Sequence, residues 1–76
     1  MENKQEDKFM NENQVVTILY TNYKGKTALR RIIPKSIMYA HNEWHTEDQW
    51  LMLAFDVEKN ADRTFALKDI KAWYLE

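Results

Sequence analysis

Residues 14–33 read QVVTILYTNYKGKTALRRII, and this stretch is typical of a β-hairpin. Its first half is rich in β-branched and aromatic residues, which favour strands. The alternate positions Val16, Ile18 and Tyr20 form the more uniformly apolar set, so we expect them on the buried face. Gly25 is the only glycine in the chain, and glycine tolerates the positive φ that a tight turn requires. We therefore expect two strands joined by a turn at this glycine.

Outward from the hairpin, the chain continues as short apolar runs separated by polar turns. Pro34 has no backbone N–H, so we expect it to end the second strand. A single helical turn is expected near residues 68–70. Further strands are expected at residues 36–41, 49–57, 63–67 and 71–76, with a turn at 58–62. The pattern predicts an all-β fold of about five strands, and closure into a small SH3-like or Sm-like barrel would remove its exposed edges.

The length of 76 residues corresponds to one domain. A domain of this size buries only about 60% of the surface that its unfolded chain exposes. There is no cysteine, so neither a disulfide nor a thiolate metal site can add stability, and three tryptophans, four tyrosines and three phenylalanines must supply much of the core. We expect residues 1–13 to be a disordered polar tail and residues 14–76 to form the barrel domain.

No apolar run approaches the roughly 20 residues of a membrane span. The polar N-terminal residues lack the apolar region of a secretory signal. The absence of cysteine also fits a reducing compartment. We therefore expect a soluble cytoplasmic protein that does not act at a membrane.

The net charge of −1 conceals two halves of opposite charge. Residues 41–62 carry six acidic residues and one lysine. Residues 20–40 carry no acidic residue and five basic ones, namely Lys24, Lys26, Arg30, Arg31 and Lys35. If the basic residues share one face, that face would attract anions. Alternatively, they are ordinary surface residues that partly pair with the acidic half.

Several features follow one another in an order that resembles the WYL domain family. They are a strand that ends in Tyr20, the turn at Gly25, Arg30 four residues before Pro34, the run Trp50-Leu51-Met52 that continues to Ala54 and Asp56, and the closing run Arg63-Thr-Phe65-Ala-Leu67-Lys-Asp-Ile70. Each feature alone is common, whereas their joint order and spacing is fairly specific. The resemblance covers roughly residues 15–72.

This resemblance implies an Sm-like or SH3-like barrel that binds a ligand, often anionic or nucleic acid, through tyrosine and arginine side chains. WYL domains usually stand behind a helix-turn-helix in bacterial transcription regulators, whereas this chain is similar to short, free-standing members. It departs from the family at Leu51, where the motif has its central tyrosine, and at Ala66 and Asp69, where arginine is frequent. The positions carried over as candidate ligand contacts are Tyr20, Arg30 and Arg63.

Arg30 and Arg63 are the strongest candidate binding residues, because a guanidinium presents a planar fork of donors that matches phosphate or carboxylate. If the two arginines lie near each other and beside Tyr20, they would form an anion pocket. Lys24 and Lys26 would add to its positive charge. Alternatively, Arg63 pairs with Asp56 across the last hairpin and only stabilises the barrel.

Aromatic residues are a second group of candidates, because their rings stack on nucleobases in single-strand binders. Trp44 and Tyr23 lie in or beside turns, so we expect them to be exposed. Trp50 and Trp73 are expected in the core.

Neither a metal site nor a catalytic site is indicated. His41 and His45 flank a loop with no recognised ligand pattern, and we expect them to be structural or exposed. Ser36, the only serine, lacks the context of a nucleophile elbow, and there is no glycine-rich phosphate loop. We therefore expect no enzymatic activity, no metal and no cofactor.

The function predicted from the sequence is a non-enzymatic ligand-binding or regulatory domain for an anionic ligand such as a nucleotide or single-stranded nucleic acid. The alternative is a protein-interaction or homo-oligomeric assembly module without nucleic-acid binding, because small barrels offer open strand edges. Its partner would be a second copy of the chain or a separate regulator protein. The effect of salt distinguishes the two functions, because phosphate binding weakens steeply with added salt and apolar association does not.

Overall fold

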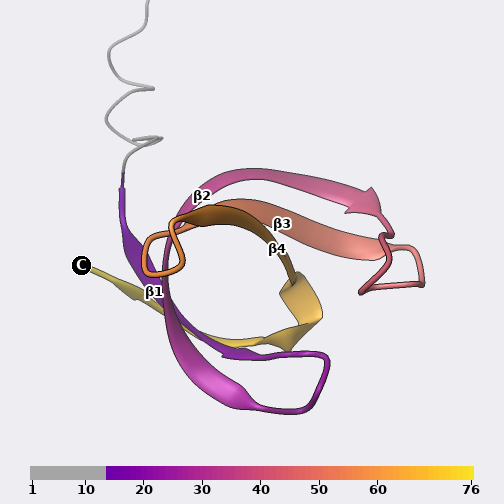
Figure 1. Cartoon of the computed structure of the whole chain (residues 1–76), viewed down its shortest axis with the longest axis horizontal. Coiled ribbons are helices and arrows are strands. Elements are labelled where there is room, and N and C mark those ends of the chain that lie inside the picture. Colours follow the sequence, from indigo (N-terminus) through magenta and orange to yellow (C-terminus); the bar gives the residue numbers. More distant parts are fainter. Residues whose placement is uncertain (1–13) are drawn as a thin grey trace, which may run out of the picture.

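The computed structural model describes residues 14–76 as a single antiparallel β-sheet (Figure 1). Its strands stand in the order β4-β3-β2-β1-β5. They are β1 (Val16–Thr21), β2 (Thr27–Ala40), β3 (Gln49–Asp56), β4 (Ala61–Ala66) and β5 (Ile70–Leu75). One turn of 3-10 helix, η1 (Leu67–Asp69), links β4 to β5. The predicted all-β fold of five strands with at most a short helical turn is confirmed, and the predicted tail at residues 1–13 lies outside the described residues.

None of the helical structure found in residues 14–76 is long and apolar enough to cross a membrane.

The first hairpin turns at the predicted glycine. Gly25 has a φ of 82°, in the left-handed region that residues with a side chain rarely adopt. The side-chain oxygen of Asn22 accepts the backbone N–H groups of Lys24 and Lys26 at 2.9 and 3.0 Å. An asparagine that begins a turn in this way supplies acceptors that the sheet ladder does not provide. The turn between β1 and β2 is thus determined by residues within it.

β2 is one continuous strand of 14 residues, where the sequence suggested two. The prediction that Pro34 ends the pairing is wrong, because Pro34 lies opposite Ala54 of β3 and the ladder resumes with Ser36 opposite Leu53. The register shifts between Pro34 and Ser36, and this bulge accommodates a residue that has no N–H to donate. β2 therefore runs on through the bulge as the long curved band in Figure 1.

The sheet curls strongly, but its ladders do not close it into a barrel. Among the described strands, β4 pairs only with β3 and β5 pairs only with β1. In Figure 1 the five strands curve around a common centre, and η1 carries the chain from β4 back to β5. One side-chain hydrogen bond spans the gap that the ladders leave between β1 and β4. In it, the Tyr20 hydroxyl of β1 accepts the Ala66 N–H of β4 at 2.9 Å. The predicted closure by strand pairing is therefore not seen, and the fold is a curled open sheet.

The core lies on the inner face of the curled sheet. It is formed by seven buried side chains, namely Val16, Ile18, Tyr20, Ile32, Met52, Ala54 and Phe65. The prediction that β1 buries its alternate residues 16, 18 and 20 is confirmed. Trp50 and Trp73, however, are 54% and 45% exposed, so their placement in the core is wrong. Trp50 lies near the far end of the β2–β3 ladder, and Trp73 lies on an edge strand with a neighbour on one side only.

Asp56 is the one buried charged side chain in residues 14–76, with 1% of its surface exposed. Its Oδ1 accepts the backbone N–H groups of Glu58 and Lys59, both at 3.1 Å. The backbone oxygen of the same aspartate accepts the N–H of Asn60, whose φ is 56°. Asp56 thereby organises the predicted turn between β3 and β4 from its inner side.

Three of the basic residues in the first half of the chain are engaged in ion pairs, and one of them is Arg30, which lies beside Asp56. Arg31 donates from Nε and Nη2 to the Glu76 carboxylate at 3.0 and 3.1 Å. These hydrogen bonds and a further one from Thr17 lower the pKa of Glu76 to about 2. Lys35 pairs with Asp62 at 3.0 Å. The basic half therefore does not form one uninterrupted cationic face.

Candidate ligand-binding pocket

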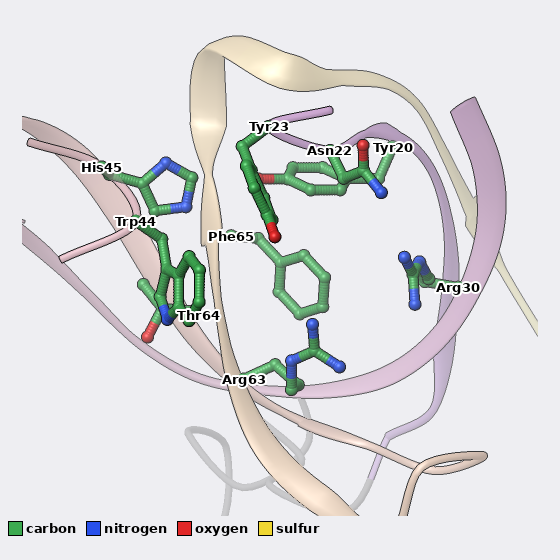
Figure 2. A pocket seen from close by; sticks show the side chains of 9 residues that line it. All are labelled: Tyr20, Asn22, Tyr23, Arg30, Trp44, His45, Arg63, Thr64 and Phe65. Carbon is green, nitrogen blue, oxygen red and sulfur yellow. The ribbon is translucent and has the colours of Figure 1, made fainter. Parts of the chain in front are cut away.

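A pocket of about 320 Å³ lies among the first hairpin, the loop between β2 and β3, and strand β4. Figure 2 shows its lining residues, which include two arginines and four aromatic rings. These are Arg30, Arg63, Tyr20, Tyr23, Trp44 and Phe65. Pockets for small ligands run from about 300 to 1,000 Å³ and combine apolar walls with a few polar groups. This one has the composition of such a site and lies at the small end of the range.

The two candidate arginines line this one pocket although they come from different strands. Arg30 on β2 lies opposite Ile18 of β1, and Arg63 on β4 lies opposite Ala54 of β3. Both of these partners are buried in the core, and cross-strand partners project to the same face of a sheet. In Figure 2 the Arg63 guanidinium points into the pocket next to the Phe65 ring, and Arg30 lies on an adjoining wall. The curl of the sheet brings the two cations into one site.

The two arginines differ in their surroundings. The Arg30 side chain is only 19% exposed, and its Nη1 lies 3.9 Å from Oδ2 of Asp56. Within the described chain, neither Arg30 Nε nor Asp56 Oδ2 has a hydrogen-bond partner. Arg63 is exposed, and no carboxylate of residues 14–76 lies within ion-pair distance of it. The alternative that Arg63 pairs with Asp56 is therefore wrong, because Arg30 takes that place.

Tyr20 forms an inner wall of the pocket, and most of its side chain packs in the core. It is 4% exposed, and its ring meets Phe65 edge to face with centroids 4.9 Å apart. Burial raises the pKa of Tyr20 above its ordinary value, with the hydrogen bond from Ala66 as an opposing cause. The hydroxyl thus stays protonated at neutral pH. Since a phenol can accept and donate at once, it retains one donor beyond its bond to Ala66.

Tyr23 and Trp44 form an exposed aromatic pair on the rim of the pocket. They are 61% and 57% exposed, so the prediction that these two aromatics face solvent is confirmed. Their ring centroids lie 5.2 Å apart, with the planes tilted by 37°. Figure 2 shows the Tyr23 hydroxyl pointing toward the middle of the pocket. Two large rings held together in solvent offer a flat ligand a surface for stacking.

Asparagines that the sequence analysis did not single out position both aromatics. Asn22 precedes Tyr23 and organises the first turn, as described above. The side-chain oxygen of Asn42 accepts the N–H groups of Trp44 and His45 at 2.9 and 2.7 Å. An asparagine followed within two residues by an aromatic in a polar stretch is the signal that could have identified them.

The remaining candidates lie outside the pocket walls or on their margin. Lys24 and Lys26 are exposed in the first turn, and Lys24 Nζ lies 5.8 Å from the Tyr23 ring centroid. His41 is hydrogen-bonded to Asp48 at 2.7 Å, away from the pocket, whereas His45 is half-buried and lines it. Residues 14–76 hold no group of three or more histidine or acidic side chains arranged for a metal ion.

Comparison of the chain with protein-family models, with curated proteins and with solved structures found no match in any of the three. The fold and the site define the class as a small all-β domain with a pocket lined by arginine and aromatic side chains.

Proposed function

We propose that this chain is a WYL-type ligand-binding domain whose pocket captures an anionic ligand such as a nucleotide or single-stranded nucleic acid. The observation that carries the proposal is the placement of Arg30 and Arg63 in one pocket. Two guanidinium forks supply the planar donors that phosphate and carboxylate groups accept. As a regulatory domain, it binds its ligand and does not transform it.

The proposed architecture is an SH3-like or Sm-like barrel. The curl of the five-stranded sheet supports it, as does the Tyr20–Ala66 hydrogen bond that joins β1 to the end of β4. The residue order that resembles the WYL family also agrees with this architecture. In such a barrel the pocket would lie at one end, between the first hairpin and β4.

The two arginines have different tasks in this proposal. Arg63 is exposed and faces the pocket with no described carboxylate beside it, so it supplies the main attraction for an incoming anion. Arg30 lies beside the buried Asp56, which balances its charge, so it contributes donors at smaller electrostatic cost to the fold. Lys24 and Lys26 add attraction at longer range from the exposed turn.

The test is an amide chemical-shift titration at low salt with a short single-stranded oligonucleotide and, separately, with a mixture of nucleotides. Shifts are expected on Tyr23, Arg30, Trp44 and Arg63, and the affinity should fall as salt is added. Replacing Arg63 with glutamine is expected to weaken binding by roughly tenfold or more, since hydrogen bonds to charged groups contribute about 1.5–3 kcal/mol. Lys71→Gln is the matched control, because it removes one positive charge from an exposed position on β5 outside the pocket wall.

The control variant should bind within about twofold of the wild type, because an exposed charge outside the site contributes little. An equal loss in Lys71→Gln and Arg63→Gln would mean that the anion meets only the general surface charge. The absence of any salt-sensitive shift with either ligand would contradict the proposal for this chain.

A second function is favoured by an apolar patch near the far end of the β2–β3 ladder, formed by Ile37, Tyr39 and Trp50. These side chains are 58%, 60% and 54% exposed. Tyr39 lies opposite Trp50 with ring centroids 5.3 Å apart, and Ile37 lies two residues away on the same face. Exposed apolar clusters mark interaction sites. We propose assembly with a second copy of the chain as the alternative function.

Sedimentation equilibrium at low and high salt tests this alternative. We expect a dimer whose affinity is unchanged by salt, because apolar association is not screened. Trp50→Ser should weaken dimerisation by roughly thirtyfold or more, since removal of a buried interface aromatic costs about 2 kcal/mol or more. Trp73→Ser, which changes an exposed tryptophan on β5, serves as the control and should dimerise normally. A wild type that stays monomeric at the highest concentration would exclude the alternative.

A further inference from the structure

We infer that the pocket takes one nucleotide-sized ligand, a flat ring linked to a single anionic group, and not a continuing nucleic-acid strand. The inference rests on the proposed function and specifies its ligand. It follows from how the aromatic and cationic groups are distributed around the pocket, from the size of the pocket, and from the charge of the surface next to it.

The aromatic and cationic groups lie on different sides of the pocket. In Figure 2 Trp44 and Tyr23 lie together at one side, whereas Arg30 and Arg63 lie at the other side and below. Phe65 lies between the two groups and is buried, at 3% exposure. A ligand that uses both groups must therefore carry a flat apolar part and an anion at its opposite ends.

The aromatic pair is held in place before any ligand binds. Hydrogen bonds from the turns to Asn22 and Asn42 fix the backbone at or beside each ring. The rings are tilted by 37°, so they do not fully cover one another, and both remain more than half exposed. Groups that are already ordered bind at a lower entropic cost. Such a rim suits stacking by one planar ring.

The volume limits how much of a ligand can enter. At about 320 Å³ the pocket lies at the lower end of the range for small-molecule sites. One ring and one anionic group fill a pocket of this size. Several stacked nucleotides would extend beyond it, over the aromatic rim.

The surface beyond the rim opposes a second phosphate. A smaller hollow of about 200 Å³ shares Tyr23 and Trp44 with the pocket and is also lined by Glu47, Asp69 and Lys68. The lysine is already paired with Asp69 at 3.1 Å. A strand that continued past the aromatic pair would thus bring its phosphates close to two carboxylates, and like charges disfavour such contact. A ligand with one anionic group avoids this repulsion.

The test is isothermal titration calorimetry of the whole chain with five probes. Adenosine monophosphate carries both the ring and the anion, ribose phosphate lacks the ring, and adenosine lacks the anion. Indole carboxylate offers a ring and an anion without a nucleotide, and an oligothymidylate series offers a strand. Adenosine monophosphate is expected to bind about tenfold more tightly than ribose phosphate, which is the range for stacking of one base on an aromatic side chain. The oligothymidylates should gain no affinity as they lengthen.

Trp44→Leu removes the stacking ring but keeps an apolar side chain. It should weaken the binding of adenosine monophosphate by about tenfold and leave ribose phosphate binding unchanged. Tyr39→Leu is the matched control, because it changes an aromatic of similar exposure that does not line the pocket. Indole carboxylate binding that matches adenosine monophosphate, and that also depends on Trp44, would support the same chemistry and identify an aromatic acid as its source.

The inference and the proposed function fail in different ways. If ribose phosphate binds as tightly as adenosine monophosphate, or if Trp44→Leu changes neither, the single-ring inference is overturned while anion binding stands. Affinity that rises steadily with oligothymidylate length would overturn it in favour of a strand. If no probe binds, the proposed function fails together with the inference.

Discussion

Replacing Asp56 with alanine is expected to lower the free energy of unfolding by about 3 kcal/mol, measured by urea denaturation followed through tryptophan fluorescence. The alanine would leave the N–H groups of Glu58 and Lys59 without their acceptor in a turn that Asp56 organises. It would also leave Arg30, which is only 19% exposed, without its nearby carboxylate. Breaking a buried pair costs about 3–5 kcal/mol, and the long 3.9 Å separation places this one at the lower end.

Two further variants separate the causes of this loss. Asp56→Asn keeps the Oδ1 acceptor for the turn and removes only the charge, so it should lose roughly half as much stability. Asp62→Ala is the matched control, because that aspartate makes an exposed ion pair with Lys35 and should change stability by less than about 1 kcal/mol. Equal losses in Asp56→Ala and Asp62→Ala would show that burial of Asp56 has no energetic consequence.

Replacing Tyr20 with phenylalanine is expected to cost about 2 kcal/mol in the same measurement. The substitution keeps the edge-to-face contact with Phe65 and removes only the hydroxyl. The N–H of Ala66, a residue with no exposed surface, would then lose its acceptor. Because this bond links β1 to the end of β4, amide exchange should accelerate more at Ala66 than in the β1–β2 ladder. Uniform acceleration would contradict this role for the hydroxyl.

The same tyrosine makes the free energy of unfolding depend on pH in the alkaline range. Burial raises the pKa of Tyr20 above the value near 10 that it has when unfolded. Above pH 10 the unfolded chain loses the Tyr20 proton before the folded protein does. The stability that Tyr20 contributes is therefore complete below pH 10 and is lost as the pH rises through the folded-state pKa. Tyr20→Phe should therefore lose stability less steeply above pH 10 than the wild type does. Identical slopes for the two proteins would show that Tyr20 does not titrate differently on folding.

Three turns around the inner face share one hydrogen-bonding pattern. In each turn, the side-chain oxygen of an asparagine or aspartate accepts backbone N–H groups of the residues that follow it. Asn22 does so after β1, Asn42 does so after β2, and Asp56 does so at the end of β3. The first two place the aromatic rim, and the remaining carboxylate oxygen of the third lies 3.9 Å from Nη1 of Arg30. Local turn chemistry thus determines much of the pocket, although its parts come from distant segments.

The sequence by itself determined the features that depend on neighbouring residues. The alternation through Val16, Ile18 and Tyr20 identified the buried face of β1, because side chains on a strand repeat every two residues. Gly25 marked the first turn, because few other residues adopt its φ of 82°. The strand content and the exposed turn aromatics Tyr23 and Trp44 were predictable for the same local reason.

Only the tertiary structure decided which strands become neighbours and how far the sheet curls. Pro34 remains within β2 because a bulge against β3 accommodates it. Trp50 is exposed because the core lies elsewhere along its ladder. Residue type and order pointed to Arg30 and Arg63 as candidates, but their meeting in one pocket, with Asp56 beside Arg30, depends on the curl that brings β1 against the end of β4. Contacts between residues so distant in sequence arise from packing of the whole sheet, which no local pattern encodes.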